Sequence, residues 1–226
     1  MTEVLEKAAH ALLAGKELAL FQPFVDGVTL TDVPGASVAR GEWQDVPVIC
    51  GTMAGDSWMF SRKVRGEAPD PRCFRGFALS TGQPWGRRAL ELGRRPIRIY
   101  FMDRTQPPKE DKTYTHGAPP FGASTPHGTE IAYLFGALPV RAQGHTEFDY
   151  ALADQMRRYW VNFAASGDPN GAGLPEWPAY TDPDRLSLHI GDEGIRAQNL
   201  IQNDIEERVQ TYTMEHPGIL CSLEGF

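Results

Sequence analysis

One short apolar run limits what this chain can fold into. Residues 46–50 ("VPVIC") show no alternation of apolar and polar side chains, and a glycine-containing loop follows them. Such a run predicts a strand covered on both faces, as in a parallel sheet, because an exposed face would carry polar side chains. A second strand is predicted over residues 95–103 ("RPIRIYFMD"), with a less complete apolar character. The sheet built from these strands needs cover on both faces.

The strongest helical pattern covers residues 147–167. Apolar and aromatic residues recur there at helical spacing, Thr146 offers a cap at the start, and Gly167 provides a stop. We interpret four aromatic side chains in and after this helix as core residues: Tyr159, Trp160, Phe163 and Trp177. A long amphipathic helix beside two apolar strands indicates an α/β fold.

Weaker patterns complete the predicted secondary structure. Residues 1–15 read as an amphipathic helix, and an Asp-Gly turn within residues 21–32 predicts a small hairpin. Residues 104–126 form a loop punctuated by proline and glycine. Three further elements are predicted: a helix near 85–93, a strand over 185–191 and a final helix over 200–212.

The composition is that of an ordinary globular protein, with 41% hydrophobic and 23% charged residues among 226. A net charge of -7 argues against nucleic-acid binding, because phosphate contacts require a basic surface. No apolar run is long enough to cross a membrane, and the start of the chain lacks the features of a secretory signal. The three cysteines are widely spaced and not arranged as metal ligands. We therefore expect a cytoplasmic protein with no cofactor, no metal, no nucleic-acid partner and no membrane contact.

Two polar side chains stand after the two predicted strands. Asp56 follows the strand that ends at Gly51, and His127 follows the second strand after a long loop. In an α/β-hydrolase the nucleophile comes first along the chain, followed by the acid and then the histidine. A histidine can take a proton from a serine hydroxyl, and a carboxylate fixes its tautomer and stabilises the imidazolium. On spacing alone, an ordinary loop histidine is the more common case.

Four segments carry a resemblance to a known family. They are "FQPFVDGVTL", "VPVICGTMAGDSWMF", "PHGTEIAYLFG" and "MRRYWVNFAASGDPNGAGLPEWPAY". In this order they resemble the C-terminal part of the type-B carboxylesterases, the cholinesterase-like branch of the α/β-hydrolases. The resemblance covers most of residues 20–190. It implies a single partial domain over residues 1–226, with a mostly parallel sheet and flanking helices but without the N-terminal part of the fold.

The resemblance also implies roles for individual residues. His127 falls on the catalytic histidine of the family, and Asp56 on its catalytic acid, which is usually a glutamate. Three neighbours of the acid depart from the family pattern: Met53, Gly55 and Ser57. Glu130 matches a buried family glutamate and is interpreted as structural. The implied reaction is hydrolysis of a small carboxylic ester, in which the acid orients the histidine, and the histidine activates a serine and then a water.

The nucleophile is missing from its expected place. A G-x-S-x-G segment between a strand and a helix should precede Asp56. The first 55 residues contain a single serine, Ser37 in "GASVARG", where the last glycine of the motif is missing and Arg40 lies beyond. We therefore predict a chain that is inactive alone and is completed by a separate N-terminal chain, since an incomplete sheet exposes an edge and apolar surface.

Two alternatives stay open at this point. The chain can be a non-catalytic remnant that associates with itself or with a partner protein. A weaker alternative is a small independent hydrolase that uses Ser57, which stands in a Gly-Asp-Ser segment after an apolar strand. Hydrolases with that nucleophile motif pair it with a late D-x-x-H, and here Asp184 and His189 have a different spacing.

Overall fold

The structure, a computed structural model, describes residues 25–32, 34–56, 76, 78–80, 82–107, 125–140, 144–182 and 184–215. Its four strands form one sheet in the order β1 (Val48–Met53), β2 (Ile97–Met102), β3 (Ser187–Gly191) and β4 (Gly194–Gln198). Strands β1, β2 and β3 run parallel, and β4 returns antiparallel beside β3. The sheet is mixed and mostly parallel, which confirms the predicted fold class.

Strand β2 is the buried centre of this sheet. All six of its residues are buried, whereas β1 is only half-buried over its first four residues. Successive side chains of a strand point to opposite faces of the sheet. Ile97 and Ile99 accordingly belong to one apolar cluster, while Tyr100 and Met102 belong to another. A strand with apolar side chains on both faces fits only where both faces are covered.

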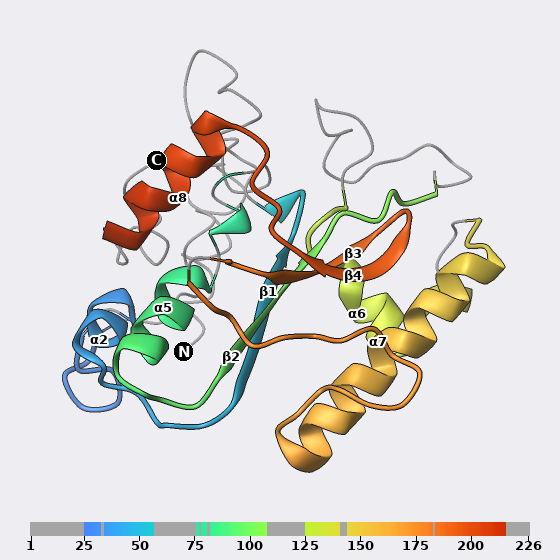
Figure 1. Cartoon of the computed structure of the whole chain (residues 1–226). Helices are drawn as coiled ribbons and strands as arrows, with labels where there is room; N and C mark the ends of the chain where they lie inside the picture. The colour runs from blue at the N-terminus through green and yellow to red at the C-terminus, as the bar shows by residue number, and fades with distance from the viewer. Residues whose placement is uncertain are drawn as a thin grey trace, which may run out of the picture.

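Helices cover both faces of the sheet (Figure 1). On one side lie α6 (Thr129–Leu134), the short 3-10 helix η1 (Leu138–Val140) and α7 (Glu147–Ser166). On the other side lie α2 (Pro34–Arg40), α5 (Gln83–Glu91) and α8 (Asp204–Glu215). The predicted helices near 85–93, over 147–167 and over 200–212 are thus confirmed as α5, α7 and α8, and the predicted strand over 185–191 is β3. No helix among the described residues is both long and apolar enough to cross a membrane.

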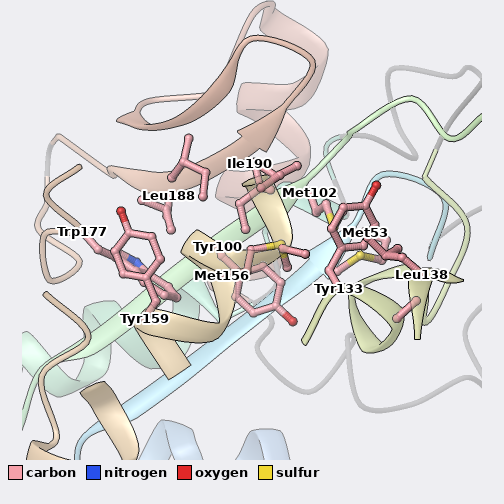
Figure 2. Packing of buried hydrophobic residues seen from close by; sticks show 14 residues of the cluster. Met53, Tyr100, Met102, Tyr133, Leu138, Met156, Tyr159, Trp177, Leu188 and Ile190 are labelled. Carbon is pink, nitrogen blue, oxygen red and sulfur yellow. The ribbon is translucent and has the colours of Figure 1, made fainter. Parts of the chain in front are cut away.

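The larger apolar cluster lies between α6, α7 and the sheet (Figure 2). Tyr159 and Trp177 are fully buried, with their rings edge to face at a centroid distance of 5.5 Å. The Trp177 indole N–H donates to the Ile99 carbonyl of β2 at 3.1 Å, which satisfies its one polar atom inside the core. Trp160 packs partly buried against this cluster, whereas Phe163 is only half-buried and is not a member of it.

Helix α7 begins and ends where the sequence predicts. The backbone N–H and the hydroxyl of Thr146 both donate to Asp149 Oδ2, at 2.9 and 3.0 Å. Gly167 has a φ of 77°, and its N–H donates to the Phe163 carbonyl at 2.7 Å. A left-handed glycine just beyond the last turn is a frequent helix stop, because it carries no Cβ to clash.

Other predictions differ from the structure. The hairpin predicted over residues 21–32 is wrong for its described part, which contains no strand. There Asp26 Oδ1 accepts the backbone N–H groups of Val28, Thr29 and Leu30, so a side chain replaces the ladder that a hairpin would form. Strand β4 and the short helices α2 and α6 were not predicted, and the helix predicted over residues 1–15 lies outside the described residues.

Candidate active site

Asp56 lies at the carboxyl end of β1, and its own strand fixes its carboxylate. Oδ2 accepts a hydrogen bond from the Thr52 hydroxyl at 2.7 Å and another from the Met53 N–H at 2.9 Å. The side chain is 19% exposed. Two donors on one oxygen stabilise the ionised carboxylate and leave Oδ1 for a different partner.

That partner is His127, which lies 71 positions further along the chain. Its Nδ1 is 2.9 Å from Asp56 Oδ1, which is hydrogen-bond distance. The imidazole is 52% exposed. The structure thus brings together the two residues that the sequence names as acid and histidine; their catalytic role stays a prediction.

Backbone contacts hold the acid and histidine loops together. The Gly55 N–H donates to the Thr125 carbonyl at 2.9 Å, so the residue before the acid is bonded to the loop that carries the histidine. Gly128, with a φ of 73°, then turns the chain into α6. Parallel strands end at the same edge of a sheet, and this edge is where open α/β sheets place their binding sites.

The contact between Asp56 and His127 also determines the proton chemistry of the ring. An ionised carboxylate only accepts hydrogen bonds, so Nδ1 must carry the proton in this contact. In the neutral imidazole Nε2 is then the basic nitrogen, which is the tautomer that a general base for a serine hydroxyl requires.

Tyr100 of β2 interacts electrostatically with Asp56, and it does not provide a base. Burial raises the pKa of its phenol above the usual range, and the negative charges of Glu130 and Asp56 raise it further. The phenol therefore stays protonated at neutral pH. Glu130 itself lies partly buried in the first turn of α6, and its interpretation as a structural residue stays a prediction.

A second carboxylate–histidine pair lies at the same edge of the sheet, and the sequence pattern did not predict it. Asp103, directly after β2, has its Oδ1 2.6 Å from His189 Nε2, and the Gln198 amide lies 2.9 Å from His189 Nδ1. The imidazole is only 12% exposed and stacks on Phe101. With both ring nitrogens engaged, His189 clamps β2, β3 and β4 together rather than offering a base. The sequence feature that could have indicated this pair is the position of Asp103 directly after β2, which parallels the position of Asp56 after β1.

Of the two serines considered as nucleophiles, the structure describes only Ser37, and it does not stand in a strand-to-helix elbow. Ser37 lies inside α2, and its carbonyl accepts the Glu42 N–H. The buried Ser80 hydroxyl donates to the Gly76 carbonyl at 2.8 Å. Ser57 lies outside the described residues.

Comparisons with known proteins agree with this architecture. A model of the carboxylesterase family matches residues 84–208, just over half of the chain. Carboxylesterase 5A of Canis lupus familiaris is 37% identical over 130 residues, which are 53% of this chain and 22% of that protein. Liver carboxylesterase 1 of Oryctolagus cuniculus is 43% identical over 79 residues, which are 35% of this chain and 14% of that protein.

Solved structures give the same result for the fold. A PNB esterase superimposes with a TM-score of 0.62 and 19% identity, covering 92% of this chain and 48% of that one. A carboxylesterase of Geobacillus stearothermophilus has a TM-score of 0.56 and 21% identity, with coverages of 91% and 48%. Nearly all of this chain therefore shares their fold. The chain spans about half the length of these structures and less than a quarter of the two curated relatives.

Proposed function

We propose that this chain, which belongs to the carboxylesterase family, contributes the acid and the histidine of a Ser-His-Asp triad that hydrolyses a carboxylic ester. The observation that carries the proposal is the 2.9 Å contact between Asp56 Oδ1 and His127 Nδ1. Asp56 Oδ2 is fixed by hydrogen bonds from Thr52 and Met53, and the imidazole of His127 is half-exposed. A partly buried, anchored acid beside an exposed base is an arrangement suited to proton transfer to and from a substrate.

In the proposed mechanism Asp56 keeps the proton of the neutral imidazole on Nδ1. His127 Nε2 then takes the proton of a serine hydroxyl as the oxygen attacks the ester carbonyl, and it returns the proton to the leaving alcohol. A water molecule is activated in the same way to release the acid product from the acyl-enzyme. Asp56 stays ionised and stabilises the imidazolium that forms in each half-reaction.

We propose further that the serine comes from a separate N-terminal chain. The one serine before Asp56, Ser37, lies in a helix and not in a strand-to-helix elbow. The chain also matches only about half the length of the esterase structures that share its fold.

The open edge of β1 is the proposed docking surface for that N-terminal chain. Among the described residues β1 pairs with β2 alone, and no described strand lies along its other edge. A strand with no partner strand on one edge is a template for a further strand, and the first four residues of β1 are half-buried. Phe135 and Val140 add apolar surface after α6, with 80% and 84% of each residue exposed. Self-association through the same edge is the alternative that the experiment must separate from pairing with an N-terminal chain.

The proposal is tested with a fluorophosphonate, which modifies activated serines. The chain is treated alone and after co-expression with the N-terminal half of a carboxylesterase, and each product is weighed by mass spectrometry. We expect no adduct on this chain, an adduct on the supplied half, and hydrolysis of p-nitrophenyl butyrate by the complex alone. His127→Gln or Asp56→Asn in the complex should lower kcat by about 10³- to 10⁴-fold.

Three results would contradict parts of this proposal. An adduct on this chain alone identifies an activated serine within it and supports the independent hydrolase that uses Ser57. Full activity of the His127→Gln complex removes the histidine from the mechanism. A stable dimer of this chain that excludes the N-terminal half, measured by light scattering, supports the self-associating remnant.

A further inference from the structure

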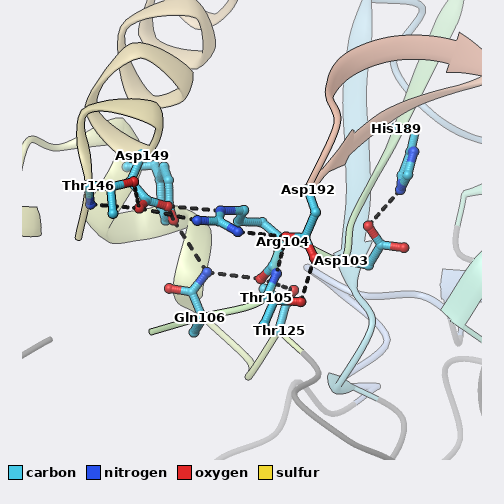
Figure 3. A network of polar contacts seen from close by, with 10 residues as sticks. Asp103, Arg104, Thr105, Gln106, Thr125, Thr146, Asp149, His189 and Asp192 are labelled. Atoms are coloured by element: carbon cyan, nitrogen blue, oxygen red, sulfur yellow. Dashed lines mark hydrogen bonds and ion pairs between the residues drawn. The ribbon is translucent and has the colours of Figure 1, made fainter. Parts of the chain in front are cut away.

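The segment that follows β2 ties three parts of the fold together through Arg104 (Figure 3). Its guanidinium makes two contacts with the carboxylate of Asp149 in the first turn of α7, at 2.9 and 3.3 Å. The remaining nitrogen donates to Asp192 in the β3–β4 turn at 2.7 Å. Arg104 is 15% exposed and Asp149 is fully buried, so this two-pronged ion pair is shielded from water. The backbone at Arg104 is therefore held in place from α7 and from the β3–β4 turn.

The histidine loop is attached to this fixed backbone through one side chain. The Thr125 hydroxyl donates to the Arg104 carbonyl at 2.8 Å. Thr125 is completely buried and stands two residues before His127. Tyr133 of α6 adds a second attachment, because its hydroxyl donates to Asp149 Oδ1 at 2.8 Å.

The same residue also reaches the acid loop. The Thr125 carbonyl accepts the N–H of Gly55, the residue directly before Asp56, at 2.9 Å. Thr125 therefore makes two hydrogen bonds. Its hydroxyl donates to Arg104, just after β2, and its carbonyl accepts the N–H of Gly55 in the loop of the acid. Moving Thr125 would change the separation of Asp56 and His127, because only Pro126 intervenes on the side of the histidine and only Gly55 on the side of the acid.

We infer that Thr125, anchored by the Arg104–Asp149 ion pair, is a positioning residue that sets the distance between Asp56 and His127. This inference rests on the proposed function of the Asp56–His127 pair. In that function Thr125 holds the pair in place but does not itself contact the substrate. Thr125 acts through a hydroxyl whose replacement by a methyl group preserves its shape. Thr125→Val and Thr125→Ser therefore separate the hydrogen bond from the packing.

The test is an NMR measurement on the whole chain with ¹⁵N-labelled histidine. The tautomer of each of the six imidazoles is read from its nitrogen shifts, and exchange of each ring proton with water is timed. His127 is assigned with His127→Gln. We expect a protected Nδ1 proton on His127 in the unmodified chain. In Thr125→Val its exchange should accelerate roughly tenfold, the equivalent of one lost hydrogen bond, whereas Thr125→Ser should keep the protection.

His189 serves as an internal control, because its two nitrogens are held by Asp103 and Gln198 at the same sheet edge. Its signals should not change in either variant. Loss of the His189 signals in Thr125→Val would mean that the substitution disturbs the sheet edge itself. Thr125→Ala is then measured instead, and the same change in His127 proton exchange is expected. An unchanged His127 proton in the hydroxyl-free variant, or equal loss of protection in Thr125→Ser, overturns the inference.

Asp56→Asn distinguishes failure of the inference from failure of the proposed function. This variant should abolish the protected His127 proton. If it does so while removal of the Thr125 hydroxyl does not, the acid–histidine pair stands and Thr125 is not its positioning residue. If Asp56→Asn leaves His127 unchanged, the pair itself is absent and both the function and the inference fail.

Discussion

The buried Asp149 makes the stability of this fold depend on pH in a calculable way. Burial alone raises the pKa of this carboxyl, but hydrogen bonds from Arg104, Thr146 and Tyr133 outweigh burial and lower the pKa from 3.8 to about 2. A folded-state pKa below the unfolded value means that the unfolded chain binds the proton first as the pH falls. The stabilisation is therefore complete above about pH 5 and is lost as the pH falls from about 4 to 2.

The size of the effect follows from the same pKa values. A lowering of just under two pKa units corresponds to about 2 kcal/mol of free energy of unfolding, and roughly 1 kcal/mol of this is already lost at pH 3. We measure urea unfolding by the fluorescence of the five tryptophans at pH 7 and pH 3, for the unmodified chain and for Asp149→Asn. The variant should be less stable at pH 7, and its deficit should shrink by about 1 kcal/mol at pH 3.

A matched control is available on the same helix. Asp154 of α7 is 60% exposed and lies 3.5 Å from Arg157. An exposed pair of this kind contributes little, so Asp154→Asn should change the free energy of unfolding by less than about 0.5 kcal/mol at both pH values. A deficit of Asp149→Asn that is equal at pH 7 and pH 3 would refute the reasoning, because it would mean that the folded chain does not lower the pKa of this carboxyl.

Two substitutions in the sheet carry further predictions. A Cβ added at Gly51 would lie 2.3 Å from the Tyr100 ring and 2.4 Å from the Tyr100 carbonyl oxygen, so Gly51→Ala must push β1 and β2 apart. It should lower the free energy of unfolding by about 1–3 kcal/mol, read from urea curves followed by circular dichroism. Trp177→Phe removes the N–H that satisfies the Ile99 carbonyl and should cost about 2 kcal/mol in the same assay. A loss below 0.5 kcal/mol in either variant, which is roughly that of a neutral surface change, would contradict these contacts.

The parts of the fold with a strong local pattern could be predicted from the sequence. Helix α7 was predicted almost to the residue, because its apolar spacing, its cap at Thr146 and its stop at Gly167 are all local features. Strand β4 was missed, because its short run "GIRAQ" contains Arg196 and Gln198 and is fixed by pairing with β3. The hairpin near Asp26 was predicted wrongly although its Asp-Gly turn signal is local. The Asp26 side chain accepts backbone N–H groups there, and the segment forms a loop without strands.

The candidate site could be predicted only in part. The order of Asp56 and His127 along the chain, together with the family motifs, named both residues, and the structure joins them at 2.9 Å. The contacts of Arg104, Thr125 and Asp149 were not predicted, because the residues that hold the loops are 21 and 45 positions apart in sequence and belong to no motif. The pairing of His189 with Asp103 depends in the same way on which strands lie side by side.

In the proposed triad Asp56 stands where the resembled family usually has a glutamate, and the backbone makes up for the shorter side chain. A side chain with one methylene fewer reaches less far, so its loop must approach the histidine loop more closely. The hydrogen bond from the Gly55 N–H to the Thr125 carbonyl joins the two loops directly beside the pair. Thr52 and Met53 meanwhile hold Oδ2, which turns Oδ1 toward His127. The contact of the acid with its histidine therefore depends on the separation of two loops, and that separation depends on the buried anchor at Thr125.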